Sequence, residues 1–406
     1  MIVKFTVGNF LSFKDKKTLS FEATSIKEHP ENIIKHRGKK LLRSMVVYGA
    51  NSSGKSNLIK AMDRMRNVLQ YSVKLNPDEK LDYSPFLLST ETEGQPTFFE
   101  VEFFIEKDLY RYGFEYNETE IVSEWLFKTE KKKEKVLLIR ENNTIIEIAD
   151  SLTIESYKTR IRLNKNRLYL SLSAQLGLEE MVSIMHFFDV NLLPISGLLH
   201  QNIFETIMES PDNYFGDIDI IKIVNDMLSI VFKLGFTKLE VVDSVDGKNK
   251  EIKTAHIKYD KEGKVKEEVF FDCRQQESEG TKKMIDLILP IMMAIVRGTC
   301  LVIDELDAKL HPILTQEIIK LYYTKSVYTN NPQLLFATHD TNLLSSDLFR
   351  RDQIWFTEKD EVEQTDLYCL ADMKLPDGSK VRNDSNLEKN YIRGRYGAIP
   401  YISNKD

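Results

Sequence analysis

A glycine-rich segment at residues 49–56, GANSSGKS, matches the pattern Gly-x-x-x-x-Gly-Lys-Ser/Thr at every fixed position. In such a loop the backbone N–H groups surround phosphate oxygens, and the dipole of the following helix adds positive potential. Lys55 would reach the β- and γ-phosphates of a nucleoside triphosphate, and Ser56 would place its hydroxyl on Mg²⁺. Gly49 and Gly54 would let the backbone approach the anion closely. The residues expected to contact the nucleotide are Gly49, Ala50, Asn51, Ser52, Ser53, Gly54, Lys55, Ser56 and Asn57.

Two adjacent carboxylates, Asp304 and Glu305, follow the apolar run at residues 300–303. An acidic loop after a strand is common in isolation, but a phosphate-binding loop elsewhere in the chain gives these carboxylates a chemical role. Asp304 would hold Mg²⁺, directly or through water. Glu305 would polarise the attacking water as a general base. We therefore predict a hydrolytic site that combines this strand end with the glycine-rich loop.

Two further polar segments stand where they could complete such a site. Thr338 and His339 follow the apolar run at residues 334–337, and His339 would contact the γ-phosphate and the attacking water from that strand end. A lone histidine is more often structural, but its place at a strand end favours the catalytic interpretation. Ser278 and Gly280 precede a predicted helix, about 20 residues before the acidic strand. They would cap the helix and let the backbone approach an anion, although a simple helix cap explains the same residues.

Hydrophobic periodicity predicts the elements that would position these residues. A buried strand at residues 42–48 runs into the glycine-rich loop, and the apolar spacing after the loop predicts a helix. Strands and helices are both predicted along the whole chain, as in an α/β protein. Further strands are predicted at residues 2–7, 19–23, 97–127 (a meander), 136–140, 144–148, 237–273 (two long strands), 300–305, 333–337 and in the tail to residue 406, and helices at residues 175–235, 281–296 and 314–323.

The composition is that of an ordinary globular protein. Of the 406 residues, 42% are hydrophobic and 29% are charged, which is enough apolar content for a sizeable core. The formal net charge of -6 argues against a uniformly basic nucleic-acid binder, so any contact with DNA or RNA must come from a local patch. The distant cysteines Cys273, Cys300 and Cys369 predict neither a disulfide framework nor a zinc site. No apolar stretch reaches the roughly 18–20 residues that span a bilayer, so we expect a soluble, cytoplasmic protein without a membrane partner.

These segments, in this order and spacing, resemble those of ABC-type ATPases with SMC-like heads. GNFLSF at residues 8–13 is similar to the NF-x-S-F opening of the RecF- and OLD-like group. VIDELDAKLHP at residues 302–312 resembles the Walker B and D-loop segment of these proteins, and ATHD at residues 337–340 resembles their H-loop. EKNYIRGRYGAIP at residues 388–400 is similar to the end of the RloA/AbiLi-like ATPases, AAA-family proteins of phage-defence operons.

The resemblance implies a fold and a mode of assembly. The expected fold is a two-lobed ABC-type P-loop ATPase head of the α/β class, with mixed β-sheets and a helical insertion between the P-loop and the signature motif. Two protomers would dimerise head to tail on ATP and Mg²⁺, and Ser278 and Gly280 of one protomer would cover the nucleotide of the other. The expected catalytic residues are Lys55, Glu305 and His339, and the expected magnesium ligands are Ser56 and Asp304. The expected domains are ATPase lobe I at residues 1–170, the helical insertion at 171–236, ATPase lobe II at 237–345 and a strand-rich tail at 346–406.

The sequence departs from the family pattern in three places. Glu277 and Glu279 flank the signature serine where transporters carry Leu and Gly, so transporter rules do not transfer. His311 follows Leu310 in the D-loop, where many relatives have Asp. Gln175 is a candidate for the Q-loop glutamine, although an ordinary exposed helix residue is the favoured interpretation.

Other basic segments have no assigned role. The lysine-rich run at residues 131–135 is typical of a solvated hairpin tip. The alternating basic residues at 158–167 could meet a phosphate backbone, but a solvated face is favoured here too. In the tail, Arg393, Arg395 and Tyr396 could contact a partner or nucleotide, or could pack the C-terminal segment.

The leading functional hypothesis is an ATPase that serves as sensor or motor of an antiphage (abortive infection) system, with a separately encoded effector such as a nuclease. The first alternative is a RecF- or SMC-type DNA repair ATPase, for which neither a long coiled coil nor a clearly basic face is evident. A transporter subunit is disfavoured, because about 220 residues separate Ser56 from Ser278. An OLD-type nuclease would need a Toprim domain after His339, where about 67 residues follow, fewer than in a usual domain.

Overall fold

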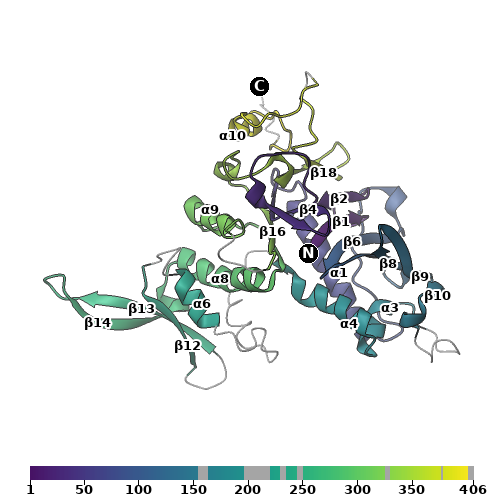
Figure 1. Cartoon of the computed structure of the whole chain (residues 1–406), viewed down its shortest axis with the longest axis horizontal. Coiled ribbons are helices and arrows are strands. Elements are labelled where there is room, and N and C mark those ends of the chain that lie inside the picture. Colours follow the sequence, from purple (N-terminus) through teal and green to yellow (C-terminus); the bar gives the residue numbers. More distant parts are fainter. Residues whose placement is uncertain are drawn as a thin grey trace.

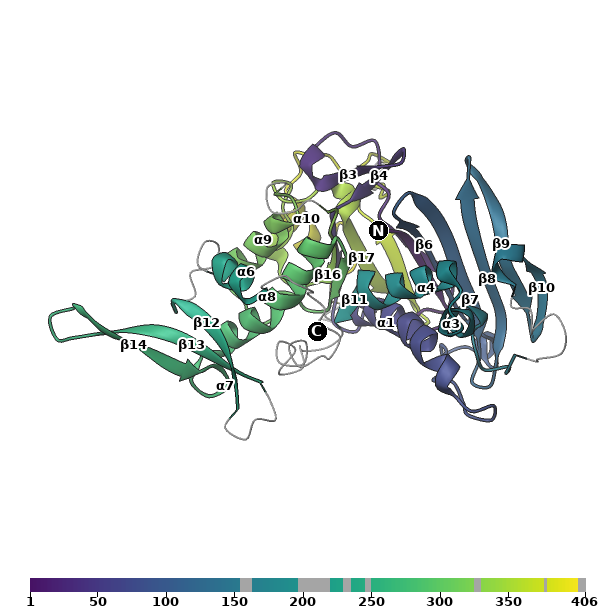
Figure 2. The ribbon, with the colours of Figure 1, turned by 60° about the horizontal axis from the view of Figure 1, so that its bottom comes forward.

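Two β-sheets, with helices between and beside them, form the body of the protein (Figure 1). The computed structural model describes residues 1–153, 163–195, 220–228, 235–244, 250–324, 330–375 and 378–400. In Figure 2 the antiparallel sheet lies on the right, the mixed sheet lies in the centre, and a three-stranded arm projects on the left. None of the helices in the described ranges is long and apolar enough to cross a bilayer.

The seven-stranded sheet is antiparallel, with the strand order β10-β9-β8-β7-β6-β1-β2. Its strands are β1 (Ile2–Gly8), β2 (Lys17–Ser20), β6 (Thr97–Ile105), β7 (Asp108–Tyr116), β8 (Ile121–Glu130), β9 (Lys133–Glu141) and β10 (Thr144–Ile148). Burial alternates along most of β6, because one face packs on the core and the other is more open to solvent. The predicted meander and the two strands after it are confirmed.

The six-stranded sheet has the order β11-β15-β16-β5-β17-β18, and only β18 runs antiparallel to its neighbour. Its strands are β5 (Ser44–Tyr48), β11 (Leu192–Ile195), β15 (Cys300–Ile303), β16 (Gln333–Ala337), β17 (Ile354–Lys359) and β18 (Thr365–Cys369). Every residue of β5, β15 and β16 is buried, because helices cover both faces of these strands. The carboxyl ends of parallel strands share one edge of a sheet. The P-loop (residues 49–56), the acidic pair Asp304 and Glu305, and the H-loop (residues 337–340) therefore lie at the same edge.

Helices on both faces of the six-stranded sheet complete two apolar cores. α1 (Lys55–Tyr71) packs between the two sheets, and Val47 of β5 lies in the same core. α8 (Glu279–Arg297) and α9 (Pro312–Leu321) form the second core, with Val46 of β5. Adjacent residues of β5 thus point to opposite faces, as strand geometry requires. The buried apolar residues of α1 recur at helical spacing and include Leu58, Met62, Met65 and Leu69.

Smaller elements surround this body. A hairpin of β3 (Ile33–His36) and β4 (Lys39–Leu42) precedes β5. The projecting arm consists of β12 (Lys238–Asp243), β13 (Lys250–Tyr259) and β14 (Val265–Asp272). The other described helices are α3 (Tyr169–Gln175), α4 (Glu179–His186), α6 (Ile220–Met227), α7 (Cys273–Gln276) and α10 (Leu387–Ile392).

The structure corrects several predicted elements. Residues 192–195 form β11, so the helix prediction is wrong there, although α3, α4 and α6 are helical. Periodicity cannot separate a short apolar run such as LLPI from a helix segment, and Pro194 fits an edge strand because it has no N–H. Residues 196–219 and 229–234 of the predicted insertion lie outside the described ranges. The segment at 237–273 has three strands instead of two, and the tail contains α10 beside its strands.

A buried ion pair joins the antiparallel sheet to α3. Glu124 on β8 and Arg140 on β9 are almost fully buried, and Arg140 Nη1 lies 3.4 Å from Glu124 Oε2. The carboxylate also accepts hydrogen bonds from the backbone N–H groups of Tyr169 (2.7 Å) and Leu170 (3.0 Å). The Tyr112 hydroxyl donates a further bond at 3.0 Å. Glu124 therefore fixes the start of α3, where a negative charge is favoured.

We expect Glu124→Ala to lower the free energy of unfolding by about 3–5 kcal/mol, because it leaves the Arg140 guanidinium buried without its carboxylate. Glu130→Ala, at the exposed end of the same strand, is the matched control and should stay close to wild type. Urea unfolding of both variants measures the difference. Wild-type stability of Glu124→Ala would show that the ion pair does not support the fold.

Candidate nucleotide-binding site

The glycine-rich loop connects the end of β5 to the start of α1. The Ser53 N–H donates to Ala50 O at 3.2 Å and closes a turn within the loop. Gly54 is the N-cap of α1 with a φ of 111°, in the left-handed region that favours glycine. A Cβ at Gly54 would also collide with the Thr365 side chain. The first-turn N–H groups of α1 and the helix dipole therefore lie beside a tightly constrained loop that suits an anion.

Lys55 is the first residue of α1 and is only 5% exposed. Its ammonium donates to Gly49 O at 2.7 Å and to Ala50 O at 2.9 Å. Burial lowers the pKa of Lys55 from 10.5 to about 8, against the attraction of Asp304 and Glu305. A cation in this partly dry loop would interact strongly with phosphate oxygens, because solvent screens it little.

Asp304 follows the last residue of β15 and is 6% exposed. Its backbone N–H donates to Ile195 O at 3.1 Å, which fixes the strand end. Its Oδ1 atom is buried and has no hydrogen-bond partner within the part of the chain described. Such an oxygen suits a divalent cation, and Mg²⁺ prefers one or two carboxylates together with water and phosphate oxygens. Asp304 and the Ser56 hydroxyl therefore fit a magnesium ion that enters with a nucleotide.

Glu305 has a φ of 53°, a conformation that is strained for a residue with a side chain. Two contacts hold this backbone. The Lys283 ammonium on α8 donates to Glu305 O at 3.0 Å, and the Leu306 N–H donates to Ala337 O at 3.3 Å. The second contact joins the ends of β15 and β16, and so brings Glu305 beside the segment that carries His339.

One pocket of about 330 Å³ unites the P-loop with the other strand ends, and it is lined by residues 51–57, Glu305 and His339. Burial and the positive charge of Lys55 lower the pKa of His339, against the attraction of the nearby carboxylates. A neutral imidazole, with one donor and one acceptor nitrogen, is therefore favoured at neutral pH. The predicted residues Gly49, Ala50 and Asp304 do not line the pocket.

The signature segment lies outside this pocket, since neither Ser278 nor Gly280 lines it. Ser278 is the N-cap of α8, and its hydroxyl oxygen accepts a hydrogen bond from the Thr281 N–H at 3.2 Å. The predicted helix cap is therefore confirmed. A Cβ at Gly280 would lie 3.2 Å from Lys309 O, so the signature segment packs closely on the D-loop.

The glutamates that flank the signature serine have structural partners. Glu277 accepts hydrogen bonds from the Thr254 hydroxyl at 2.5 Å and from His256 Nε2 at 2.7 Å. Both partners lie on β13, so Glu277 ties the signature segment to the projecting arm. Glu279 forms ion pairs with Lys282 and Lys309, each at 3.0 Å.

The sequence matches one protein-family model over residues 44–345, and this family is described as "AAA domain, putative AbiEii toxin, Type IV TA system". The chain belongs to this AAA family. No protein with a curated description matches the sequence. One similar solved structure is titled "Crystal structure of the SmcHead bound to the C-winged helix domain of ScpA". It has a TM-score of 0.44 and 14% identity, over 91% of this chain and 97% of that chain. The family range contains every residue that lines the pocket.

Three residues outside the family range support the P-loop of this AAA-family ATPase. The Thr365 hydroxyl lies 2.9 Å from Ser53 O and 2.7 Å from the Ser12 hydroxyl. Asn57 Nδ2 donates to Ser12 Oγ at 2.7 Å. The hydroxyls of Ser53 and Thr357 are 2.7 Å apart. The motif at residues 8–13 could have indicated Ser12, whereas threonines in strands β17 and β18 carry no sequence signal.

The structure explains His311 and places Gln175, two residues at which the sequence was compared with the ABC-type ATPases. His311 is the N-cap of α9, where its Nδ1 accepts a hydrogen bond from the Ile313 N–H at 3.3 Å. It therefore provides the cap that an aspartate would provide at this position. Gln175 is the exposed last residue of α3 and does not line the pocket. The structure of this AAA-family protein thus does not bring Gln175 to the candidate site.

The remaining basic segments are placed in part. Residues 131–135 are exposed around the turn between β8 and β9, as predicted. Of the predicted basic face at 158–167, the side chains at 158, 160 and 162 lie outside the described ranges. In the tail, Tyr396 is buried against Phe356, while Arg393 and Arg395 are exposed.

Proposed function

We propose that this AAA-family chain binds ATP with Mg²⁺ and hydrolyses the terminal phosphoanhydride bond. The observation that carries the proposal is the single pocket lined by the P-loop, Glu305 and His339. Lys55 would neutralise charge on the β- and γ-phosphates from inside the loop. Ser56 and Asp304 would hold Mg²⁺, which would stabilise the phosphate charge that develops in the transition state.

The catalytic side chains would divide the remaining work. Glu305 would accept a proton from the attacking water as general base. Its carbonyl contact with Lys283 holds the strained backbone, so little reorganisation is needed when the reaction occurs. His339 would remain neutral because its pKa is lowered, and would hydrogen-bond the water or the γ-phosphate.

We also propose that two protomers dimerise head to tail when ATP binds. Ser278 is exposed at the start of α8, and it lies with Gly280 outside the pocket of its own protomer. The nucleotide of a second protomer would be the ligand of this segment, because first-turn N–H groups and the helix dipole favour a phosphate. The contacts of Glu277 and Gly280 with β13 and the D-loop would hold the segment in place.

Gly280→Asp is expected to abolish ATP hydrolysis while the isolated protomer still binds ATP. The new carboxylate would face the γ-phosphate of the partner's nucleotide, and like charges a few ångströms apart in a partly dry interface repel strongly. Gly280→Asn has the same size without the charge and should retain more activity. Phosphate release and equilibrium nucleotide binding measure both properties. Wild-type hydrolysis by Gly280→Asp would argue against pairing of the signature segment with a nucleotide.

Mixing two inactive variants tests the composite site directly. A heterodimer of Lys55→Ala with Gly280→Asp contains one site that combines an intact P-loop with an intact signature segment. With random pairing, about a quarter of wild-type activity should return, because half of the dimers are mixed and each has one of two sites intact. Activity that remains absent after mixing would show that each protomer uses its own signature segment.

The proposed biological role is that of sensor or motor in an antiphage (abortive infection) system with a separately encoded effector. The description of the matched family, which names a putative AbiEii toxin, supports this role, as does the resemblance of residues 388–400 to phage-defence ATPases. The division into lobe I (1–170), insertion (171–236), lobe II (237–345) and tail (346–406) stays part of the proposal. A RecF- or SMC-type repair ATPase remains the alternative.

We expect the purified chain to cleave neither DNA nor RNA, and protection from phage to require the effector as well. The strong acidic and histidine motifs of the sequence, Asp304, Glu305 and His339, are already assigned to ATP hydrolysis. The test is incubation of the chain alone with DNA and RNA plus Mg²⁺ or Mn²⁺. Robust cleavage that persists in Lys55→Ala would overturn this division of labour and favour a nuclease.

A further inference from the structure

A basic hollow lies at the opposite end of β5 from the nucleotide pocket. β5 begins at Ser44 and ends at the P-loop, so the two sites are separated by the length of the strand, roughly 17 Å at the usual rise per residue. The hollow has a volume of about 820 Å³. It lies between the β3–β4 hairpin, the loop at residues 24–31 and the segment that precedes β16. Its lining residues are Thr24, Ser25, Ile26, Lys27, Pro30, Glu31, Ile33, Lys35, Lys40, Arg43 and Asn331.

Cations dominate the charge of this hollow. Lys27, Lys35 and Lys40 are exposed, and within the described ranges none of them forms an ion pair with a carboxylate. Arg43 is 4% exposed and donates from Nε to Glu31 O at 3.1 Å, so a buried guanidinium forms part of the lining. Among the described lining residues, Glu31 is the one with an acidic side chain. The described lining therefore has four positive groups and one carboxylate, although the chain as a whole carries a net charge of -6.

The β3–β4 hairpin places like charges side by side. Lys35 and Lys40 are directly opposite each other in the antiparallel register. Side chains at such positions have Cβ atoms about 5 Å apart on the same face, where two like charges destabilise the pair. The neighbouring Lys39 points to the other face and is neutralised by Glu22 at 2.7 Å and Glu102 at 3.2 Å. On one face of the hairpin, carboxylates thus neutralise Lys39. On the face of the hollow, Lys35 and Lys40 have no such carboxylate among the described residues.

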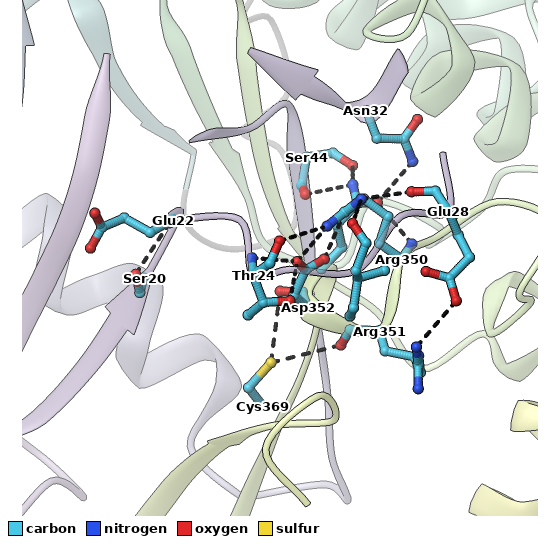
Figure 3. Close-up of polar contacts among 12 residues, drawn as sticks. Ser20, Glu22, Thr24, Glu28, Asn32, Ser44, Arg350, Arg351, Asp352 and Cys369 are labelled. Atoms are coloured by element: carbon cyan, nitrogen blue, oxygen red, sulfur yellow. Dashed lines mark hydrogen bonds and ion pairs between the residues drawn. The ribbon is translucent and has the colours of Figure 1, made fainter. Parts of the chain in front are cut away.

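The loop beside the hairpin is held rigidly (Figure 3). The buried Arg350 forms a bidentate ion pair with Asp352, from Nε to Oδ1 at 2.9 Å and from Nη2 to Oδ2 at 2.8 Å. Its Nη1 also donates to Glu28 O at 2.6 Å. Asp352 accepts hydrogen bonds from the Thr24 N–H at 2.8 Å and from the Thr24 hydroxyl at 2.9 Å. The position of Lys27 relative to the hairpin is therefore set by a buried network, so the cations form a preorganised surface.

A second hollow shares Thr24, Ser25, Ile26 and Lys27 with the first but has a more balanced charge. It has a volume of about 370 Å³, and its charged lining residues are Lys27, Glu28, Arg351, Asp372 and Lys380. Arg351 and Glu28 form an ion pair at 3.1 Å. The excess of positive charge is therefore greater in the larger hollow.

We infer that the hollow of Lys27, Lys35, Lys40 and Arg43 binds the phosphodiester backbone of a nucleic acid. Several separate cations suit a chain of phosphates, whose binding releases counterions and depends little on sequence. Thr24, Ser25 and Asn331 add hydroxyl and amide groups of the kind that contact phosphates and sugars. This site is separate from the P-loop and does not depend on ATP hydrolysis.

The test compares two triple variants with the same change of charge. Lys27→Ala/Lys35→Ala/Lys40→Ala removes the exposed cations of the hollow, while Lys131→Ala/Lys132→Ala/Lys133→Ala removes three exposed lysines from the distant β8–β9 turn. Fluorescence anisotropy with labelled duplex DNA, single-stranded DNA and single-stranded RNA, at 50 to 200 mM salt, measures affinity and its salt dependence. Lys55→Ala is included to exclude binding of the probe at the P-loop. Poly-glutamate serves as a control polyanion that has no phosphates.

We expect the hollow variant to lose at least about tenfold in affinity and to flatten the slope of log affinity against log salt by about 2 to 3 units. The turn variant and Lys55→Ala should bind the nucleic acid like wild type, and basal ATP hydrolysis of the hollow variant should be unchanged. The probe that the wild-type protein binds with the highest affinity identifies the kind of nucleic acid. Absence of binding by wild type, equal loss in both triple variants, or equal affinity for poly-glutamate would each overturn the inference.

Discussion

Glu305→Gln is expected to bind ATP like the wild type and to hydrolyse it about 10²–10⁴-fold more slowly. The amide keeps the size of the side chain and the left-handed backbone, but it cannot accept the proton of the attacking water. Asp304 remains as the magnesium ligand, so nucleotide affinity should hold. Because ATP would persist in the pocket, an ATP-dependent dimer should accumulate and appear in size-exclusion chromatography.

A matched control separates the base from a general loss of charge. Glu317→Gln makes the same substitution on α9, where Glu317 forms a surface ion pair with Lys320 at 2.8 Å. This variant should hydrolyse ATP at the wild-type rate. Phosphate release, equilibrium nucleotide binding and chromatography with and without ATP give the three readouts. Turnover of Glu305→Gln at the wild-type rate would exclude Glu305 as the base, whatever the behaviour of the dimer.

The local part of the site could be predicted from the sequence. The glycine pattern, the helix after it and the two acidic residues after an apolar strand depend on short-range geometry, and the structure has β5, α1 and β15 at the predicted places. That these strand ends meet also follows from the sequence, because buried parallel strands align their carboxyl ends. The pocket that contains Glu305 and His339 is the result.

The long-range support of the site could not be predicted. Thr365 and Ser12 are separated by more than 350 residues in the chain, and only the pairing of β18 with β17 brings the Thr365 hydroxyl under the P-loop. Lys283 reads as an ordinary position of an amphipathic helix, yet its ammonium holds the backbone of Glu305. β11 could not be predicted because its four residues fit either a helix or a strand, and only its pairing with β15 at the sheet edge decides.

The different environments of similar lysine residues could not be predicted from the sequence either. Lys35 and Lys39 look equivalent in a run of basic residues, and strand register alone puts one of them in the hollow and the other between two glutamates. The same limit applies to Lys55, whose identity follows from the motif but whose burial and lowered pKa follow from the packing of the loop.

Lys55→Ala is expected to abolish ATP hydrolysis and to weaken nucleotide binding by roughly 10- to 100-fold, as for the loss of a charged hydrogen bond. The β- and γ-phosphates would lose the one cation that the loop itself provides, so both the bound nucleotide and the transition state are less stable. Lys60→Ala is the matched control, because Lys60 is exposed on the same helix and its substitution should leave both properties unchanged. Wild-type binding and turnover by Lys55→Ala would reject the P-loop assignment.

The pH dependence of binding provides an independent check of the same side chain. With a pKa of about 8 in the free protein, Lys55 loses its proton as the pH rises above 8, whereas bound phosphates favour the charged form. Nucleotide binding above pH 8 must therefore take up a proton, and the apparent affinity should fall by up to about tenfold per pH unit. Lys55→Arg, whose guanidinium stays charged, should abolish this fall if the variant still binds. An affinity of the wild-type protein that stays constant from pH 7 to pH 9.5 would contradict the combination of a lowered Lys55 pKa with an ammonium–phosphate contact.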